Sequence, residues 1–438
     1  MRLKQKYRDN LSITQVNTTP KVLKVLFVSH TYLVGVNQGK LNAIASPAGG
    51  IAEMGNIEVG LLAPSNWKAS EWNRLIPLET PYAHIRTYSA PVLFSGRGGA
   101  HIYPPWKIWQ VLNDFRPDIV QVEEEVFSLC TYQFALWSRF TGKPLVIFGW
   151  ENMDRQLSLP RRWISKFVLN TARLVLPGNQ DGAAIMRRWG YKGLLEVMPQ
   201  MGVDPKFFAP RQHKEGDWGK RSDRPFHIGY LGRLTHSKGI DLILQAVHQL
   251  RQQGFNFRIL ICGSGEYEAE LKQISQEQGV ADWVIWQDAV PHAKAPEIIS
   301  QFDVLVLPSR TTCKWKEQFG HVLIEAMAMG VPVIGADSGE IPHVIGREDL
   351  VFPEEDVRGL AAMLKRMIEQ PKWRQEAENY GLERVNLLYT HERIAEQLIG
   401  LWRTVLPPNF VNRSVNSGEP TVKIESLSRQ NESVRGLN

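Results

Sequence analysis

Residues 317–339 read EQFGHVLIEAMAMGVPVIGADSG, and this stretch decides the fold of the second half of the chain. The apolar residues between Val322 and Met329 favour a short helix, which Gly330 ends in the manner of a C′ glycine. The next residues, 331–334, are β-branched apart from one proline and predict a buried strand. A helix that leads directly into a buried strand is the repeating unit of a parallel α/β layer.

Two carboxylates, Glu317 and Glu325, lie eight positions apart in this stretch. Positions eight apart on one helix differ by about 80° around its axis, so Glu317 fits better in the loop before the helix. A helix N-terminus carries unpaired N–H groups and suits phosphate, whereas carboxylates accept hydrogen bonds from sugar hydroxyls. The stretch therefore predicts a site for a nucleotide-sugar.

The whole chain has the composition of a globular protein with two or three domains. It has 438 residues, of which 43% are hydrophobic and 22% charged. Its three cysteines are widely spaced, which predicts reduced thiols and a cytoplasmic location. No apolar run approaches the ~20 residues of a membrane span, and the polar N-terminus does not resemble a signal peptide. The net charge of +6 is compatible with an anionic substrate or membrane, and no nucleic-acid motif is present.

Two series of alternating strands and helices predict an α/β fold of two facing Rossmann-like domains with a cleft between them. Residues 1–20 are expected to be flexible, and 206–225, rich in proline and charge, are expected to form the linker. The first domain is predicted at 21–205 and the second at 226–389, followed by a C-terminal helix at 390–406 and a disordered tail at 407–438. Strands of the first domain are expected at 21–30, 57–63, 84–90, 118–122, 145–148 and 174–176.

The first predicted strand of the second domain leads into Gly232 and Arg233, with Lys238 five residues further on. A glycine lets the backbone approach a ligand, and an Arg and a Lys at this spacing could both reach one diphosphate. An ordinary solvated loop with surface cations remains an alternative for the two basic residues.

The helix at 161–171 is basic and amphipathic, and either rests on anionic lipid or presents a solvated face.

Three glutamates, Glu123 to Glu125, end the predicted strand at 118–122. Adjacent residues of a strand point to opposite faces, so at most two of the three can face a ligand. We predict that Glu123 or Glu125 lies in the cleft, and we expect no metal because there is no Asp-x-Asp pattern. His321 is a further candidate, because it follows Gly320 at the predicted helix start.

An ordered set of motifs, clearest at 226–345, resembles the retaining glycosyltransferases of the GT-B fold, in the group that includes sucrose synthase and bacterial mannosyltransferases. The set is Gly232-Arg233-Leu234, Lys238-Gly239, Gly263-Ser264-Gly265, Pro308-Ser309, the acid-x7-acid pair Glu317–Glu325, and the run from Glu325 to Val333. The resemblance covers roughly residues 22–405.

The resemblance implies roles for the matching residues. Arg233 and Lys238 would hold the donor diphosphate, Glu325 the ribose hydroxyls, and Glu317 the hydroxyls of the transferred sugar. The backbone around Phe319, Gly320 and His321 would approach sugar and phosphate. It also implies a metal-independent reaction and a final helix, 390–406, that crosses back to the first domain. Many relatives have a histidine where this chain has Glu123, which we assign as a possible catalytic assistant.

We therefore expect a retaining glycosyltransferase that moves a hexose from a UDP- or GDP-linked sugar to a hydroxyl acceptor, in polysaccharide or glycolipid synthesis. The acceptor would be a sugar, a glycan or a lipid-linked glycan, with possible peripheral contact to an anionic membrane. A GT-B-like epimerase or phosphorylase is one alternative. A non-catalytic protein that binds a nucleotide-sugar or glycan is another.

Overall fold

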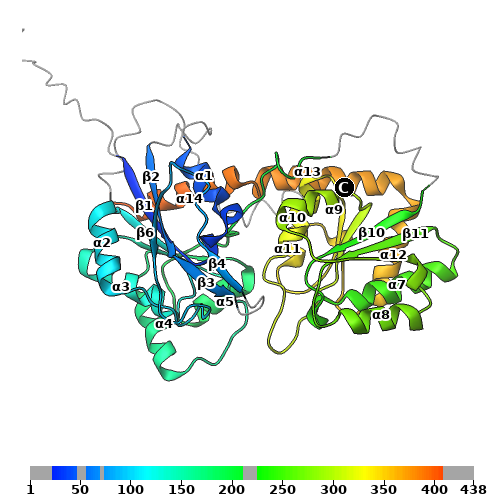
Figure 1. Ribbon diagram of the computed structural model, residues 1–438, viewed down its shortest axis with the longest axis horizontal. Helices are drawn as coiled ribbons and strands as arrows, with labels where there is room; N and C mark the ends of the chain where they lie inside the picture. Colours follow the sequence, from blue (N-terminus) through cyan, green and yellow to red (C-terminus); the bar gives the residue numbers. More distant parts are fainter. Residues whose placement is uncertain (1–21, 47–55, 70–73, 211–223, 408–438) are drawn as a thin grey trace, which may run out of the picture.

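A computed structural model describes residues 22–46, 56–69, 74–210 and 224–407 and shows two α/β lobes side by side (Figure 1). The predicted α/β fold of two Rossmann-like halves is confirmed. The predictions for residues 1–20, for most of the linker and for the tail beyond residue 407 lie outside the described residues.

The first lobe is built on a seven-stranded parallel sheet with the order β5-β2-β1-β6-β7-β8-β9. The chain adds strands on one side of β1 and then returns to add β6 on its other side, so the sheet has a topological switch point between β1 and β6. A small antiparallel hairpin of β3 and β4 follows β2. The strands are β1 Leu23–Val28, β2 Ile57–Pro64, β3 Asn66–Ala69, β4 Arg74–Pro77, β5 Arg86–Ala90, β6 Ile119–Glu123, β7 Leu145–Gly149, β8 Leu174–Pro177 and β9 Leu194–Leu195.

Both faces of this sheet are covered by helices. Alternate residues of β1 enter different cores: Leu26 and Val28 pack with α2 to α5, whereas Val25 and Phe27 pack with α1 and α14. The helices are α1 Gly39–Ala45, α2 Pro105–Phe115, α3 Leu129–Thr141, α4 Leu159–Thr171, α5 Gln180–Arg188 and, at the end of the chain, α14 His391–Val405.

The second lobe has a six-stranded parallel sheet with the order β12-β11-β10-β13-β14-β15. Its strands are β10 Phe226–Leu231, β11 Phe257–Cys262, β12 Val284–Gln287, β13 Val304–Leu307, β14 Val333–Ala336 and β15 Val351–Phe352. Its helices are α7 Ile240–Gln252, α8 Glu268–Glu277, α9 Ala295–Ile299, α10 His321–Ala328, α11 Ile341–Ile345, α12 Val357–Glu369 and α13 Pro371–Leu388. The predicted short helix is α10, and Gly330 follows it with φ +68°, as a C′ glycine does.

The last helix, α14, packs on the first lobe although it follows the second in sequence (Figure 1). Thr390 caps its N-terminus by accepting a hydrogen bond from the backbone N–H of Arg393 at 3.2 Å. Trp402 is fully buried, and its Nε1 donates to Gln121 Oε1 of β6 at 2.8 Å. An apolar stripe and one buried hydrogen bond therefore fix α14 to the first sheet.

Candidate functional site

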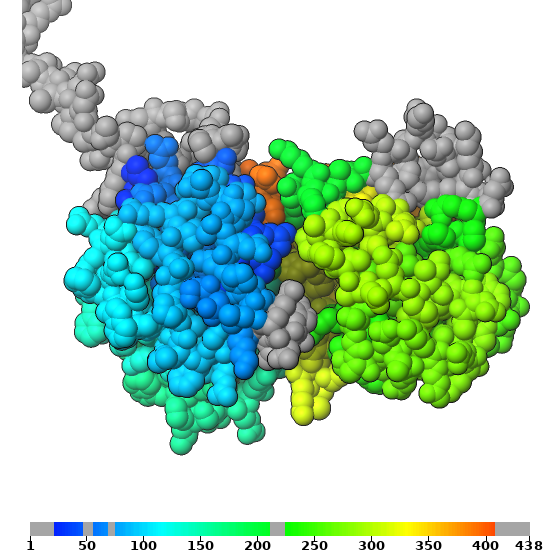
Figure 2. All heavy atoms as spheres, viewed as in Figure 1, coloured from blue at the N-terminus to red at the C-terminus, as the bar shows by residue number. Residues whose placement is uncertain are grey.

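The carboxyl ends of both parallel sheets are followed by loops that meet between the lobes, where Figure 2 shows a hollow. Ligands of open α/β sheets bind at this edge. The two lobes touch here: the ring centroid of Trp150, just after β7, lies 6.0 Å from that of Phe319, just before α10. The loop before α10, which carries Phe319, therefore lies at the interface between the lobes.

Glu317 lies in the loop before α10, which is the position that the spacing of the two acids predicts. Its Oε2 is 2.5 Å from Nζ of Lys238 and accepts a hydrogen bond from Ser309 Oγ at 2.7 Å. The Lys238 ammonium also lies 4.8 Å from the centre of the Trp315 ring. The predicted sugar-binding acid and the predicted phosphate-binding cation thus form one ion pair.

The backbone beneath this pair is closely packed. Gly239 follows Lys238 with φ +65°, and a Cβ there would lie 2.0 Å from the carbonyl oxygen of Pro308. Only glycine adopts this positive φ without strain and also leaves room for the Pro308 carbonyl. Gly239 therefore lets the turn that carries Lys238 pack against the loop after β13. In that loop, Arg310 donates to both carboxylate oxygens of Asp241 at 2.6 Å. These contacts fix Lys238 and Ser309 relative to each other.

Glu325 occupies the second turn of α10, and its Oε1 lies 3.0 Å from Nε2 of His292. The hydrogen bond to Glu325 raises the pKa of His292 above its usual 6.5. The His292 ring stacks on Phe207 with a centroid distance of 6.0 Å. Nothing in the sequence around His292 indicates this contact, which brings together residues 33 positions apart.

The remaining predicted residues of this loop lie at the start of α10. Gly320 is the N-cap with φ +82°, and no side chain caps the helix. Phe319 is buried, whereas His321 is partly exposed and lies with its ring centroid 6.0 Å from that of Trp150. Burial of the imidazole lowers the pKa of His321, which favours a neutral ring at neutral pH.

The glycine and arginine after β10 lie at the carboxyl edge of the second sheet. The backbone N–H of Gly232 donates to Cys262 O at 3.0 Å, which joins the ends of β10 and β11. Arg233 has an exposed side chain, and its carbonyl accepts a hydrogen bond from Tyr230 OH at 2.7 Å. The structure therefore places Gly232 and Arg233 on a loop neighbouring the one that carries Lys238.

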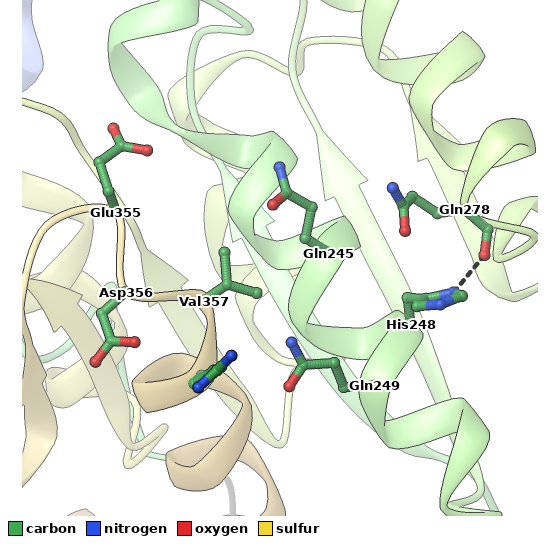
Figure 3. Close-up of a pocket in the computed structure, with 8 residues that line it drawn as sticks. Gln245, His248, Gln249, Gln278, Glu355, Asp356 and Val357 are labelled. Atoms are coloured by element: carbon green, nitrogen blue, oxygen red, sulfur yellow. Dashed lines mark hydrogen bonds between the residues drawn. The ribbon is translucent and has the colours of Figure 1, made fainter.

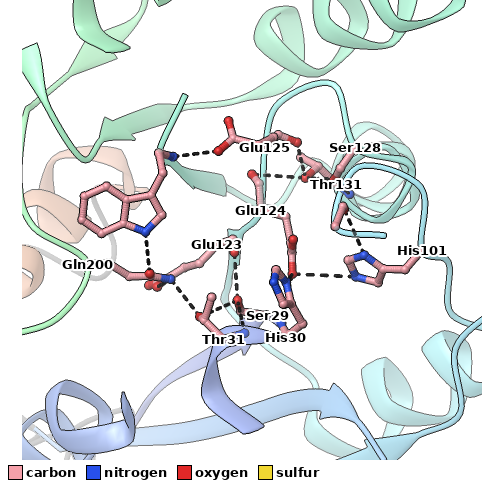
Figure 4. A network of polar contacts seen from close by, with 12 residues as sticks. Ser29, His30, Thr31, His101, Glu123, Glu124, Glu125, Ser128, Thr131 and Gln200 are labelled. Carbon is pink, nitrogen blue, oxygen red and sulfur yellow. Dashed lines mark hydrogen bonds and ion pairs between the residues drawn. The ribbon is translucent and has the colours of Figure 1, made fainter. Parts of the chain in front are cut away.

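Glu123 does not lie in the cleft, and that prediction is wrong. Its side chain is fully buried in the first lobe, where four side chains hydrogen-bond its two oxygens; one of them, Gln200, is drawn in Figure 4. The donors are Lys40 Nζ at 2.7 Å and Gln121 Nε2 at 2.6 Å to Oε1, and Tyr32 OH at 2.5 Å and Gln200 Nε2 at 2.9 Å to Oε2. A carboxylate with this many partners and no exposed surface ties helix α1 to the sheet and cannot touch a substrate.

Glu125 reaches the interface only indirectly. Its Oε1 accepts a hydrogen bond from the backbone N–H of Trp150 at 2.8 Å, while Oε2 is buried without a hydrogen-bond partner among the described residues. Burial, together with the nearby Glu151, raises the pKa of Glu125 to about 8. This buried carboxyl group therefore positions the loop after β7 through its backbone.

The first lobe also binds the Glu317 loop directly, through contacts that the sequence does not indicate. Asn152 Nδ2 donates to the carbonyl oxygens of Lys316 and Glu317 at 3.2 Å each, and Gln318 Nε2 donates to Trp150 O at 3.0 Å. The loop that carries the central acid is thus held by both lobes.

A pocket of about 410 Å³ lies elsewhere, between α7 and the start of α12 (Figure 3). None of the predicted site residues lines it. The nitrogens of its histidine, His248, are both in use, since Nδ1 lies 2.6 Å from Gln278 O and Nε2 lies 2.8 Å from Gln252 Nε2. The interface between the lobes is the better candidate site.

The described residues contain neither a cluster of metal-binding side chains nor a membrane-spanning helix. No group of three or more His, Cys, Asp or Glu side chains there could hold a metal ion. Among the helices of the described segments, none is long and apolar enough to cross a lipid bilayer.

Residues 212–384 match the family described as "Glycosyl transferases group 1". A putative colanic acid biosynthesis glycosyltransferase, WcaL, of Escherichia coli is 30% identical over 194 residues, which are 44% of this chain and 46% of that protein. A GDP-mannose-dependent alpha-(1-6)-phosphatidylinositol monomannoside mannosyltransferase of Mycolicibacterium smegmatis is 30% identical over 191 residues, 42% of this chain and 50% of that protein. The chain thus aligns with about half the length of these curated relatives.

Solved structures share the fold over nearly the whole length. Sucrose-phosphate synthase from Thermosynechococcus elongatus superposes with a TM-score of 0.63 at 20% identity, covering 87% of this chain and 99% of that one. Anabaena Alr3699/HepE in complex with UDP superposes with a TM-score of 0.63 at 18% identity, covering 87% and 100%. The chain therefore has the GT-B fold, and its residues 212–384 match the group 1 family of glycosyl transferases.

Proposed function

We propose that this chain is a retaining glycosyltransferase that transfers a hexose from a UDP- or GDP-linked sugar to a hydroxyl acceptor, in polysaccharide or glycolipid synthesis. The observation that carries the proposal is the ion pair between Lys238 and Glu317 at the interface of the lobes. The ammonium group has three N–H donors and uses one on Glu317, so two remain for phosphate oxygens. The side chains are 14% and 8% exposed, which limits their screening by water.

The reaction needs positive charge where the diphosphate leaves. The acceptor oxygen forms a bond to the anomeric carbon, the bond from that carbon to the diphosphate oxygen breaks, and its electron pair stays on the diphosphate. Attack from the same face lets the leaving diphosphate oxygen take the acceptor proton, and the configuration is retained. Lys238, Arg233 and the uncapped start of α10 would stabilise the charge that develops.

The other residues of the loop suit the remaining parts of the donor. Glu317 would accept a hydrogen bond from a hydroxyl of the transferred sugar, and Glu325 from the ribose. Backbone at Gly232, Phe319, Gly320 and His321 would line the sugar and phosphate. We propose that Lys238 and Arg233 take the place of a metal ion in neutralising the diphosphate. The test below therefore includes a chelator of free metal.

The acceptor would approach from the first lobe, and contact with an anionic membrane is part of the proposal. Helix α4 contains basic residues but no acidic residue, and its Leu159 and Trp163 are 78% and 57% exposed. Trp106 and Trp109 of α2 are each 69% exposed. Exposed tryptophans beside cations suit the interface of an anionic bilayer. A cytoplasmic enzyme resting on the membrane in this way could reach a lipid-linked acceptor.

Thermal shift with UDP, GDP, ADP and their common sugar conjugates tests the donor, in the presence of EDTA. We expect one base to raise the midpoint temperature, and we expect Lys238→Met to abolish that rise. The same donor is then incubated with candidate acceptors, and the anomeric proton of the product is examined by NMR. Stabilisation by no nucleotide at all, or a product of inverted configuration, would contradict the proposal.

A further inference from the structure

The switch point of the first sheet carries a second polar cluster that the donor site does not use. His30 follows β1 and Glu124 follows β6, so the two residues flank the crevice where the strand order reverses. Glu124 Oε1 lies 2.6 Å from His30 Nδ1 and accepts a second hydrogen bond from the His30 backbone N–H at 2.9 Å. Figure 4 shows this pair together with Glu123 and Gln200.

The hydrogen bonds determine which nitrogen of His30 faces a ligand. Burial lowers the pKa of His30 and raises that of Glu124, but the attraction between the two groups outweighs burial in both. Glu124 is therefore a carboxylate and can only accept, so Nδ1 of His30 carries a hydrogen. The remaining nitrogen, Nε2, is the hydrogen-bonding atom through which the ring can meet a ligand, and the side chain is 26% exposed.

A second histidine faces the same carboxylate. His101 Nδ1 lies 3.0 Å from the carbonyl oxygen of Gly98 and therefore donates to it, so Nε2 holds a lone pair when the ring is neutral. Burial lowers the pKa of His101, which favours the neutral ring. Its Nε2 is buried 3.7 Å from Glu124 Oε1 and has no hydrogen-bond partner among the described residues. This atom is an acceptor without a donor.

The walls of the crevice hold the ring and leave room beside it. Trp67 of β3 stacks on His30 with a centroid distance of 4.4 Å and an interplanar angle of 23°. The loop after β5 also approaches the ring, since a Cβ on Gly98 would lie 3.7 Å from His30 Cε1. The His30 side chain remains 26% exposed, so part of it stays open to a ligand.

We propose that this crevice binds a hydroxyl group of a neutral sugar on the acceptor, with His30 Nε2 as the contacting atom. His101 Nε2 and Glu124 are acceptors that require a donor from the ligand, whereas the raised pKa of His30 favours a charged ring whose Nε2–H donates. A hydroxyl group both donates and accepts, so it fits all three groups. A carboxylate at the centre of the cluster repels anions, which disfavours a phosphate or uronate group here. Glu124 is a positioning residue that fixes the tautomer of His30, and Trp67 fixes the plane of its ring.

A contact path joins this crevice to the donor side. Gln200 Nε2 donates to Thr31 Oγ1, next to His30, at 3.0 Å, and Gln200 Oε1 accepts from Trp150 Nε1 at 2.8 Å. Trp150 in turn packs on Phe319 and His321. The inference rests on the proposed function, because it makes the crevice the acceptor half of the same reaction.

The test uses the full chain labelled with ¹⁵N in its histidine rings, at pH 7.5, with methyl glycosides of glucose, galactose, mannose and N-acetylglucosamine as probes. The His30 signals, assigned by loss in His30→Ala, are expected to show hydrogen on Nδ1. At least one glycoside should shift Nε2 in a saturable way. Unchanged His30 signals with all four probes would overturn the proposal.

The decisive variant is His30→Asn. Its side-chain N–H can still donate to Glu124, but it has no atom in the place of Nε2. The proposal requires at least tenfold weaker glycoside binding for His30→Asn, as measured by saturation-transfer NMR, while the exposed control His84→Asn binds like wild type. Wild-type affinity in His30→Asn would show that the ring is only structural. Nucleotide stabilisation is measured on the same samples, so failure of the donor site is detected separately.

Discussion

Lys238 Nζ lies 2.5 Å from Glu317 Oε2, although the two residues belong to loops that follow different strands, β10 and β13. Ser309 donates to the same carboxylate oxygen, so the acid is held from two sides. Partial burial strengthens this pair relative to an exposed one. In the proposed reaction the pair joins the sugar-binding and the diphosphate-binding parts of the donor site, and the first two predictions follow from it.

Lys238→Met should weaken the binding of the nucleoside diphosphate that stabilises the wild type by about 10- to 100-fold, as expected for the loss of a charged hydrogen bond. Isothermal titration calorimetry measures the affinity directly. Lys272→Met is the matched control, because Lys272 forms an exposed ion pair with Glu268 on α8. Equal losses in both variants would show that only overall charge matters.

Glu317→Gln should lower kcat about 100-fold while the affinity for the nucleoside diphosphate alone is kept or increased. The substitution removes the negative charge that competes with phosphate for Lys238, but it also removes the acceptor for the sugar hydroxyl. The two effects are separated by calorimetry with the diphosphate and by initial rates at saturating donor. Transfer at the wild-type rate with donor near its KM would refute the assigned sugar contact.

Glu125→Gln should change how stability depends on pH. The pKa of Glu125 is raised from 4.5 to about 8, so the folded chain holds this proton more tightly than the unfolded chain. The group therefore lowers stability progressively as pH rises from about 4.5 to about 8, by at most about 1.4 kcal/mol per pH unit, and no further above that. Between pH 6 and pH 8, thermal melting should show a growing advantage of the variant over wild type, which levels off above pH 8. The exposed Glu277→Gln should show none.

Trp402→Phe should destabilise the first lobe by about 1–3 kcal/mol, because it leaves the buried Gln121 Oε1 without its donor. Urea unfolding followed by tyrosine and tryptophan fluorescence measures the midpoint. Trp109→Phe, at an exposed position on α2, is the control and should leave the midpoint unchanged. An unaltered midpoint in Trp402→Phe would mean that α14 contributes little through this contact.

Trp163→Ser combined with Leu159→Ser should reduce sedimentation with vesicles that contain an anionic phospholipid. The two exposed side chains would lose their contact with the acyl boundary, whereas the arginines of α4 would still attract the surface. Binding of the wild type should fall with added salt, in line with screening of the basic residues. Phe140→Ser, 85% exposed on α3, serves as the comparison. Undiminished binding of the wild-type protein to purely zwitterionic vesicles would contradict the proposed attraction between the basic residues of α4 and anionic lipid.

The buried position of Glu123 is a feature that local sequence patterns do not indicate. The alternation of side chains along a strand correctly indicates that neighbouring glutamates point to different sides: Glu123 contacts Lys40 of α1, whereas Glu124 contacts His30. Which of these sides faces a ligand depends on whether a helix covers it. Helix α1 covers the side of Glu123, and nothing in residues 118–125 encodes that.

The parallel α/β layers, the short helix ended by Gly330 and the place of Glu317 before that helix could all be predicted from the sequence. They follow from hydrophobic period and glycine conformation within about 20 residues. By contrast, three contacts emerge from the folded arrangement alone: Lys238 pairs with Glu317, Glu325 pairs with His292, and Asn152 holds the Glu317 loop from the other lobe. These contacts join residues 33 to 165 positions apart. Such pairings depend on strand order and on how the two lobes meet, which no local pattern specifies.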